Sequence, residues 1–312
     1  GLDTTLRPAS TGDRATNGIT AGRICLAPKA SDKRESEFDT KATQHKVKVE
    51  DLWNPNDQSA PKYKLGQGGC LGIVAAMLLM TLLYSARAVR FELFQAINRL
   101  AKRITKWDDR CDKACHKLFC YIWCHLDDKM VAWIGDKPED LTMHAYADSN
   151  FAGDPYTLKS TSGEHHSIQG PNSRFPWAAS SHGQTCLAQS TPEAELTSIN
   201  TCMKYKCEMA LTLWQRLLKW YHEEGWTVTI YLHEDNTTCI SCLRSGLNKT
   251  MKTLERGFGV DIAWGHRRIV SGDYCLIHTR SSHMAGDIYT KGFSNPKTWA
   301  RLRMLINIFF PV

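Results

Sequence analysis

Acidic side chains at the ends of expected strands and helices are the residues of this chain whose types and spacing could do chemistry. Mg²⁺ takes carboxylate, water and phosphate oxygens as ligands, so carboxylates brought together from several elements could support metal-dependent phosphoryl chemistry. Taken singly, each acid has a simpler explanation as a helix cap, a helix-dipole partner or a turn residue, and that explanation is favoured for any one alone. The candidates are Asp148, Glu193, Glu195, Asp235 and Asp287.

Short strands beyond residue 140 would position two of these acids. Residues 143–148 are expected to form a strand that carries Asp148, and residues 159–163 a turn into a second strand. Apolar and polar residues alternate over 228–232, which predicts a strand that ends at residues 234–236 and so carries Asp235. A further strand is expected at 273–279, between helices near 237–245, 254–270 and 284–292.

A long helix would carry both glutamates. Residues 190–193 combine a capping hydroxyl, a proline at the first helical position and an acid in the first turn, which predicts a helix start. Apolar residues then recur at three- and four-residue spacings, at positions 196, 199, 203, 207, 210, 214 and 217, and predict one buried face. Glu193 and Glu195 lie about equally far from the centre of that face, so helix geometry does not choose between them.

Several short motifs stand in one order over residues 142–293. They are Y-A-D at 146–148, A-G-D at 152–154, K-S-T-S-G at 159–163, S-T-P-E-A-E at 190–195, D-N at 235–236, D-I at 261–262 and A-G-D-I-Y-T-K at 285–291. This series resembles the ribonuclease H domain of copia-type LTR retrotransposon polyproteins. Residues 72–112 are similar to the segment that joins reverse transcriptase to ribonuclease H in that family, whereas the polymerase signature, an aromatic residue two before a pair of aspartates, is absent from the sequence.

The resemblance implies a fold class and a division of the chain. We expect an α/β, ribonuclease-H-like mixed five-stranded sheet flanked by helices, preceded by a small, mainly helical connection region and a disordered N-terminal tail. The divisions are a flexible tail or linker at 1–65, the helical connection at 66–139, the ribonuclease-H-like domain at 140–293 and a C-terminal extension at 294–312. Only six large apolar side chains occur in residues 1–44, too few to offset the entropy of ordering a tail.

The resemblance also implies an activity and a site. The activity is endonucleolytic hydrolysis of the RNA strand of RNA/DNA hybrids by two Mg²⁺ ions, with Mn²⁺ able to substitute, as part of a reverse transcriptase polyprotein in a cytoplasmic virus-like particle or the nucleus. The implied metal ligands and catalytic residues are Asp148, Glu195, Asp235 and Asp287, with Glu193 as the less favoured alternative to Glu195. His283 would assist product release or be a solvated loop histidine, and the substrate contacts would be Lys159, Ser160, Thr161 and Asn236. The partners would be the hybrid and the upstream reverse transcriptase domain, without a membrane.

Four departures from the family pattern leave other functions open. Glu234 replaces a cysteine beside Asp235, Leu196 replaces an aromatic residue, Gly259 replaces a histidine, and Gly286 separates an Ala-Asp pair. One alternative is an inactive or domesticated domain that only binds nucleic acid. A second is an integrase or transposase of the same fold, which the presence of four acids in the ribonuclease H order disfavours.

Composition sets broad limits on the chain. With 312 residues, 42% hydrophobic and 23% charged, it is neither disordered throughout nor fibrous, and its net charge of +7 permits a polyanionic partner without proving one. Twelve cysteines are too few for a disulfide scaffold, so we expect reduced thiols and an intracellular protein. The uncharged run at 68–86 is interpreted as a buried helix in preference to a membrane span, because an amphipathic pattern follows it.

Two cysteine patterns are interpreted as packing. Cysteines and histidines cluster at 111–125, but Cys111 and Cys120 would lie about 13 Å apart along one helix and on opposite faces, too far apart for one zinc ion. Cys239 and Cys242 are expected within a helix, where a redox role is disfavoured.

Overall fold

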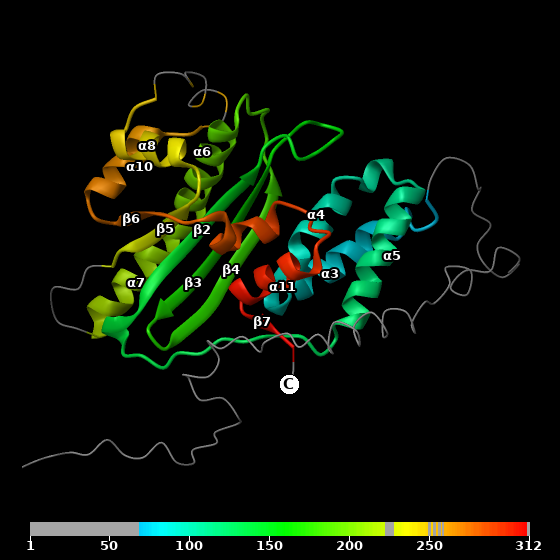
Figure 1. The fold of residues 1–312 in the computed structure, drawn as a ribbon, viewed down its shortest axis with the longest axis horizontal. Helices are drawn as coiled ribbons and strands as arrows, with labels where there is room; N and C mark the ends of the chain where they lie inside the picture. The colour runs from blue at the N-terminus through cyan, green and yellow to red at the C-terminus, as the bar shows by residue number, and fades with distance from the viewer. Residues whose placement is uncertain are drawn as a thin grey trace, which may run out of the picture.

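The computed structural model describes residues 69–221, 228–248, 251, 254, 257 and 259–310. The tail expected at 1–65 lies outside this part of the chain. Figure 1 shows a central sheet with helices on both sides. The described elements therefore suffice to test the sheet and the positions of the candidate acids.

A mixed five-stranded sheet has the strand order β4-β3-β2-β5-β6. Its strands are β2 (Thr142–Asn150), β3 (Thr161–Gly170), β4 (Ser173–Gly183), β5 (Ile230–Glu234) and β6 (Tyr274–His278). The pairs β2–β3 and β3–β4 are antiparallel, whereas β2–β5 and β5–β6 are parallel. This topology, flanked by helices, confirms the expected ribonuclease-H-like fold class.

The register between β2 and β5 brings two candidate acids to one edge of the sheet. These strands are parallel, and Tyr146 pairs with His233. When this register is continued by two residues beyond the Tyr146–His233 pair, Asp148 lies opposite Asp235, the residue that follows β5. Carboxylates on neighbouring parallel strands are thereby placed side by side, about one strand spacing apart at ~4.8 Å.

The first hydrophobic core lies between one face of the sheet and the helices that follow β4. These elements are α6 (Thr191–Cys202), a π-helical turn (Met203–Cys207), α7 (Glu208–Tyr221), α8 (Thr237–Ser245) and α10 (Ile262–Val270). Met143, Ala145 and Ala147 alternate along β2 to face this core, which Leu196 and Ile199 of α6 also enter. The apolar side chains on one face of β2 pack against those on the buried face of α6. This packing holds α6 over the strand that carries Asp148.

The long helix differs from the expected one at its middle. The π-helical turn adds a residue to one turn, and the apolar positions after it change their facing. Leu211 is consequently buried, whereas Leu217, expected on the buried face, is 40% exposed. The predicted apolar face was therefore wrong at Leu217, whereas Ala210 and Trp214 pack against the core as expected.

A second hydrophobic core is formed by helices from both ends of the described chain. These are α3 (Ala75–Val89), α4 (Phe94–Ala101), α5 (Asp109–Cys124) and α11 (Pro296–Leu305), and the short strands β1 (Lys129–Met130) and β7 (Ile308–Phe309) pair antiparallel beside them. Tyr146, on the opposite face of β2 from Ala145, packs against this core. Asn98 of α4 also donates a hydrogen bond to Ser181 of β4, at 3.1 Å. In Figure 1 the helices of this second core, α3, α4, α5 and α11, lie on the β4 side of the sheet.

Three further expectations require correction. The uncharged run was expected to form a buried helix, but α3 buries little more than Ala75, Leu79 and Ala86, and its opposite face is exposed. The helix expected at 284–292 is instead a short 3₁₀ helix, Ala285–Tyr289, and a 3₁₀ turn, Ser281–His283, precedes it. Only 262–270 of the helix expected at 254–270 is a continuous described helix. No described helix has the length and apolar character needed to cross a membrane.

Two of the four cysteines of α5 pack in the second core. Cys111 and Cys115 are buried in the second core, as the packing interpretation expects, but Cys120 and Cys124 are exposed. All cysteines in the described part of the chain are free thiols. The separation predicted from helix geometry therefore holds, and packing accounts for only half of this pattern.

Candidate carboxylate metal site

Asp148 is the buried centre of the site. It lies near the end of β2 with 1% of its surface exposed, and its backbone carbonyl accepts a hydrogen bond of 2.8 Å from Ser198 of α6. Thr290 donates a hydrogen bond to Oδ2 of the carboxylate. A side chain at Gly286 would place its Cβ 2.8 Å from the Cβ of Asp148, so glycine is needed for the 3₁₀ turn Ala285–Tyr289 to approach β2.

The two glutamates of α6 have different environments. The Ser190 hydroxyl caps the helix by accepting from the Glu193 backbone N–H, and Glu193 Oε2 accepts in return from the Gln189 N–H at 2.6 Å. This reciprocal arrangement gives Glu193 a capping role. Glu195 is instead one of three acids, with Asp148 and Asp235, each of which has one carboxylate oxygen within 4.8 Å of an oxygen of the other two. The structure thus separates two residues that helix geometry alone left equivalent.

The end of β5 contributes two adjacent acids. Asp235 is half-buried, and Ser281 donates a hydrogen bond of 2.6 Å to its Oδ2. Glu234 is fully buried, and its Oε1 accepts from the Asn236 N–H at 3.0 Å. Asn236 then caps α8 through its own side-chain oxygen. The end of the strand, the cap and the beginning of α8 together hold these acids at the sheet edge.

Two buried carboxylate oxygens of the acids at this site have no hydrogen-bond partner among the described residues. Oε2 of Glu195 and Oε2 of Glu234 make no hydrogen bond to any described residue. An unpaired buried acceptor is unfavourable, and a cation is the partner that would satisfy several such oxygens at once. The acids therefore fit a hard divalent cation, whose preferred ligands are carboxylate oxygens.

The acids raise one another's affinity for protons. Burial raises the pKa of Asp148 to about 7, with the charge of Asp287 adding to the effect and that of Lys291 opposing it. Burial, followed by the charges of Glu234 and Asp148, raises the pKa of Glu195 to about 11. Burial likewise raises the pKa of Glu234 well above its usual range. Without a cation the cluster is held in part by protons.

Ion pairs of Lys291 link Asp287 to the carboxylate cluster. Oδ1 of Asp287 lies 2.5 Å from the Nζ of Lys291, which is also 3.4 Å from Oδ1 of Asp148. The negative charges of Asp148 and Asp287 raise the pKa of Lys291 despite its partial burial, so its ammonium remains charged. Three of the four expected ligands thus form a compact group, and the fourth is joined to it by an ion pair.

The expected substrate-binding residues have structural partners. Lys159 donates to the Thr185 carbonyl at 2.6 Å, Ser160 is fully buried, and Thr161 accepts from Lys102 at 3.1 Å. Asn236 caps α8, as described above. His283 is exposed and pairs with the hydroxyl of its neighbour Ser282.

Sequence reasoning gave no role to three side chains that contact the acids, namely Ser281, Thr290 and Lys291. For Lys291 a signal exists in its four-residue spacing from Asp287, which favours an ion pair on a helical turn. Thr290 and Ser281 contact acids that are distant in sequence, so only the fold shows their roles.

Comparisons with known proteins give limited likenesses. No protein-family model and no curated protein matches the sequence. Among solved structures, RNase H1 from the halophilic archaeon Halobacterium salinarum NRC-1 is similar, with 15% identity over 46% of this chain and 90% of that chain and a TM-score of 0.29. LC11-RNase H1, isolated from compost by a metagenomic approach, shares 13% identity over 46% of this chain and 88% of that chain, with a TM-score of 0.31. The function is therefore argued from the residues of this chain.

Proposed function

We propose that this protein hydrolyses the RNA strand of RNA/DNA hybrids at the carboxylate site of Asp148, Glu195 and Asp235. The observation that carries the proposal is that one carboxylate oxygen from each of these acids, from β2, α6 and the end of β5, lies within 4.8 Å of the other two. The unpaired Oε2 of Glu195 adds to it, because that buried oxygen lacks a partner unless a cation binds. The ribonuclease-H-like topology supports the same assignment, since it supplies each of these acids from a different element.

In the proposed reaction the chain's residues hold and orient the reacting groups. Asp148, Glu195 and Asp235 would bind Mg²⁺, or Mn²⁺ in its place, and the cation would activate water and stabilise the leaving 3′ oxygen. Thr290 and Ser281 fix the orientations of the Asp148 and Asp235 carboxylates through their hydrogen bonds. A carboxylate whose second oxygen is fixed offers the remaining one in a defined direction, which reduces the reorganisation needed during reaction.

Asp287 and Lys291 would complete the site. Paired at 2.5 Å, they add a fourth carboxylate and a fixed positive charge at the edge of the cluster. Asp287 is the acid available to a second cation, and Lys291 would be displaced from it or would contact the phosphate. Specificity for RNA would come from contacts to 2′-hydroxyls, which DNA lacks.

An upstream polymerase domain is the partner that we propose for α3. Large apolar side chains recur at three- and four-residue spacings on the outer face of α3 and on the turn before it. Their exposed fractions are 71% for Ile73, 63% for Met77, 47% for Met80 and 81% for Tyr84. Such a stripe is typical of a surface covered by another domain. Copurification with a reverse transcriptase domain, lost in Met77→Glu and Tyr84→Glu, would test this part of the proposal.

The experiment for the activity uses the full chain and three labelled substrates. RNA/DNA hybrid, double-stranded DNA and double-stranded RNA are incubated with the protein in a Mg²⁺ titration, and products are separated by size. The proposal expects metal-dependent cutting of the RNA in the hybrid alone, with 5′ phosphate ends. Binding of the hybrid without any cutting at any Mg²⁺ or Mn²⁺ concentration would favour the inactive nucleic-acid-binding alternative, and cutting of double-stranded DNA would favour the transposase alternative.

A further inference from the structure

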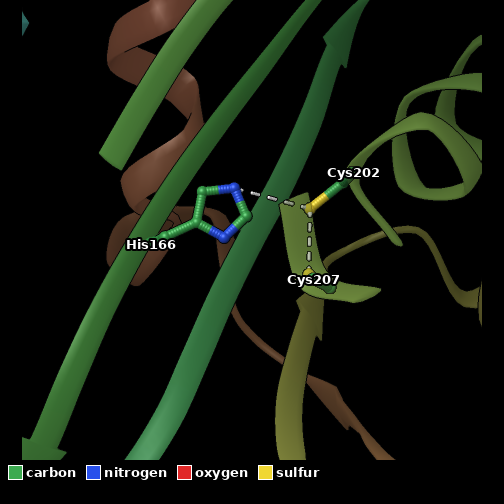
Figure 2. Close-up of side chains that lie close together, drawn as sticks. All are labelled: His166, Cys202 and Cys207. Carbon is green, nitrogen blue, oxygen red and sulfur yellow. Dashed lines mark hydrogen bonds between the residues drawn. The ribbon is translucent and has the colours of Figure 1, made fainter. Parts of the chain in front are cut away.

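A second group of metal-binding side chains lies inside the first core, apart from the carboxylates. His166 extends from β3, Cys202 ends α6, and Cys207 ends the π-helical turn (Figure 2). At least 99% of the surface of each residue is buried. The Sγ atoms of the two cysteines are 3.8 Å apart, and Sγ of Cys202 is 3.9 Å from Nε2 of His166.

The π-helical turn is the reason that the two thiols meet. In an α-helix, residues five positions apart point about 140° away from each other around the axis. The wider turn at Met203–Cys207 brings Cys202 and Cys207 onto the same side, towards β3. Such turns are rare and occur often at functional sites. The π-helical turn therefore places both sulfurs where a single ligand could contact them.

The spacing of the ligand atoms fits tetrahedral zinc. With Zn–S bonds of about 2.3 Å and Zn–N bonds of about 2.0–2.1 Å, a tetrahedral site has sulfur–sulfur edges of about 3.8 Å and sulfur–nitrogen edges of about 3.6 Å. The observed separations of 3.8 Å and 3.9 Å lie close to these edges. Soft thiolates with imidazole select zinc over the hard cations that carboxylates prefer.

Glu164 lies on the same strand, outside the three ligand atoms that are within 4.8 Å of one another. Its Oε2 is 3.5 Å from Nε2 of His166. The same oxygen lies 2.9 Å from Nζ of Lys206 and accepts from Ser180 at 3.1 Å. Zn²⁺, two thiolates, one carboxylate and one ammonium sum to zero charge, which is the condition for burying such a group.

We propose that Cys202, Cys207 and His166 bind a structural zinc ion, with the Glu164 carboxylate turning towards the two sulfurs to supply the fourth ligand. The ion would join α6 and its π-helical turn to β3. Because α6 also carries Glu195, the zinc would hold the helix that supplies one acid of the carboxylate site. The two sites differ in ligand chemistry, so this proposal stands whether or not the protein is a nuclease.

The test measures metal content and metal spectra on the full chain. Protein purified under reducing conditions should contain one zinc ion per chain, and replacement with Co²⁺ should give the charge-transfer absorption of thiolate ligands and the visible bands of a tetrahedral site. Cys202→Ser and Cys207→Ser should lose the zinc and the thiolate bands. Cys115→Ser is the matched control, because Cys115 is equally buried but lies in the second core, and it should keep both.

Thermal unfolding gives an independent readout. In buffer without added Mg²⁺ or Mn²⁺, a chelator should lower the melting temperature of the parent and of Cys115→Ser, because zinc bound only by the folded chain stabilises it. The chelator should have no effect on Cys202→Ser; if that variant does not fold, the cobalt spectrum of the parent decides the question alone. Folded parent protein that neither contains zinc nor takes up Co²⁺ through thiolates would overturn the proposal, as would a Cys202–Cys207 disulfide in the reduced preparation.

Discussion

The ammonium group of Lys291 lies 3.4 Å from Oδ1 of Asp148, the most deeply buried acid of the three-carboxylate cluster. This chain therefore places a cation of its own beside acids that fit a divalent metal. The position has two consequences, because Lys291 stabilises the site when no metal is bound and competes with a metal for Asp148.

Asp148→Asn should abolish hydrolysis while hybrid binding persists. The amide keeps the shape of the side chain but removes a charge that the metal needs, so we expect a loss of orders of magnitude in cleavage rate. Burial raises the pKa of Asp148 to about 7, so its charge is unfavourable above that pH and the neutral variant should melt at a higher temperature without metal. Cleavage assays and thermal unfolding at pH 8 measure both effects. A variant that cuts hybrid as fast as the parent would remove Asp148 from the site.

Glu195→Gln and Glu193→Gln form a matched pair on one helix. Glu195 belongs to the carboxylate cluster, so its variant should be inactive and should need far more Mg²⁺ for any stabilisation. Glu193 accepts a hydrogen bond from the Gln189 N–H, which the oxygen of a glutamine can still accept, so its variant should keep activity and stability. Metal-dependent cleavage by the two purified variants is the measurement. The reverse result would assign the metal to Glu193.

The strands of the site could be predicted from sequence because their patterns are local. Alternation along 228–232 defined β5, and the cap at Ser190 defined the start of α6, so the positions of Asp235 and Glu195 at element ends followed. What brings them together is the parallel pairing of β2 with β5, a contact between residues almost ninety positions apart. No local pattern encodes that pairing, and only the family resemblance anticipated it.

The departures of the fold from expectation have a different cause. The π-helical turn at Met203–Cys207 is invisible to a periodicity argument, because one extra residue leaves the spacing of apolar residues almost unchanged. The exposed face of α3 shows that an uncharged run does not identify which side is buried, since Met77 and Leu79 are equally apolar and only Leu79 is covered. Tertiary contacts decided both outcomes.

Lys291→Met should lower the melting temperature without metal and lower the Mg²⁺ concentration needed to restore it. Removal of the ammonium leaves Asp148 and Asp287 without their shared cation, so the carboxylates repel each other more strongly. The same removal ends the competition with a metal for these oxygens. Melting temperature against Mg²⁺ concentration measures both changes, and Lys297→Met, at an exposed position of α11, is the control. An unchanged Mg²⁺ dependence would show that Lys291 does not compete with the metal.

Two neighbouring histidines, the half-buried His144 of β2 and the buried His233 of β5, should make the protein sensitive to acid. Nδ1 of His144 lies 2.8 Å from Nε2 of His233, whose Nδ1 in turn contacts the Thr279 hydroxyl. Burial lowers the pKa of His144 to about 4 and that of His233 to about 3, because a charged imidazole would lose its hydration there. Since the unfolded chain binds these protons at higher pH than the folded one, stability should fall as the pH drops from about 6.5 towards 4.

For His144 alone, the shift from its ordinary pKa to about 4 corresponds to a loss on the order of 3 kcal/mol across that window. His144→Phe keeps an aromatic ring for stacking on Tyr231 but cannot be protonated, so its free energy of unfolding should depend less on pH than that of the parent. His283→Gln, which changes an exposed histidine, should keep the parental slope. Urea unfolding between pH 4.5 and 7.5 measures the slopes, and parallel curves for the parent and His144→Phe would show that His144 does not carry the acid sensitivity.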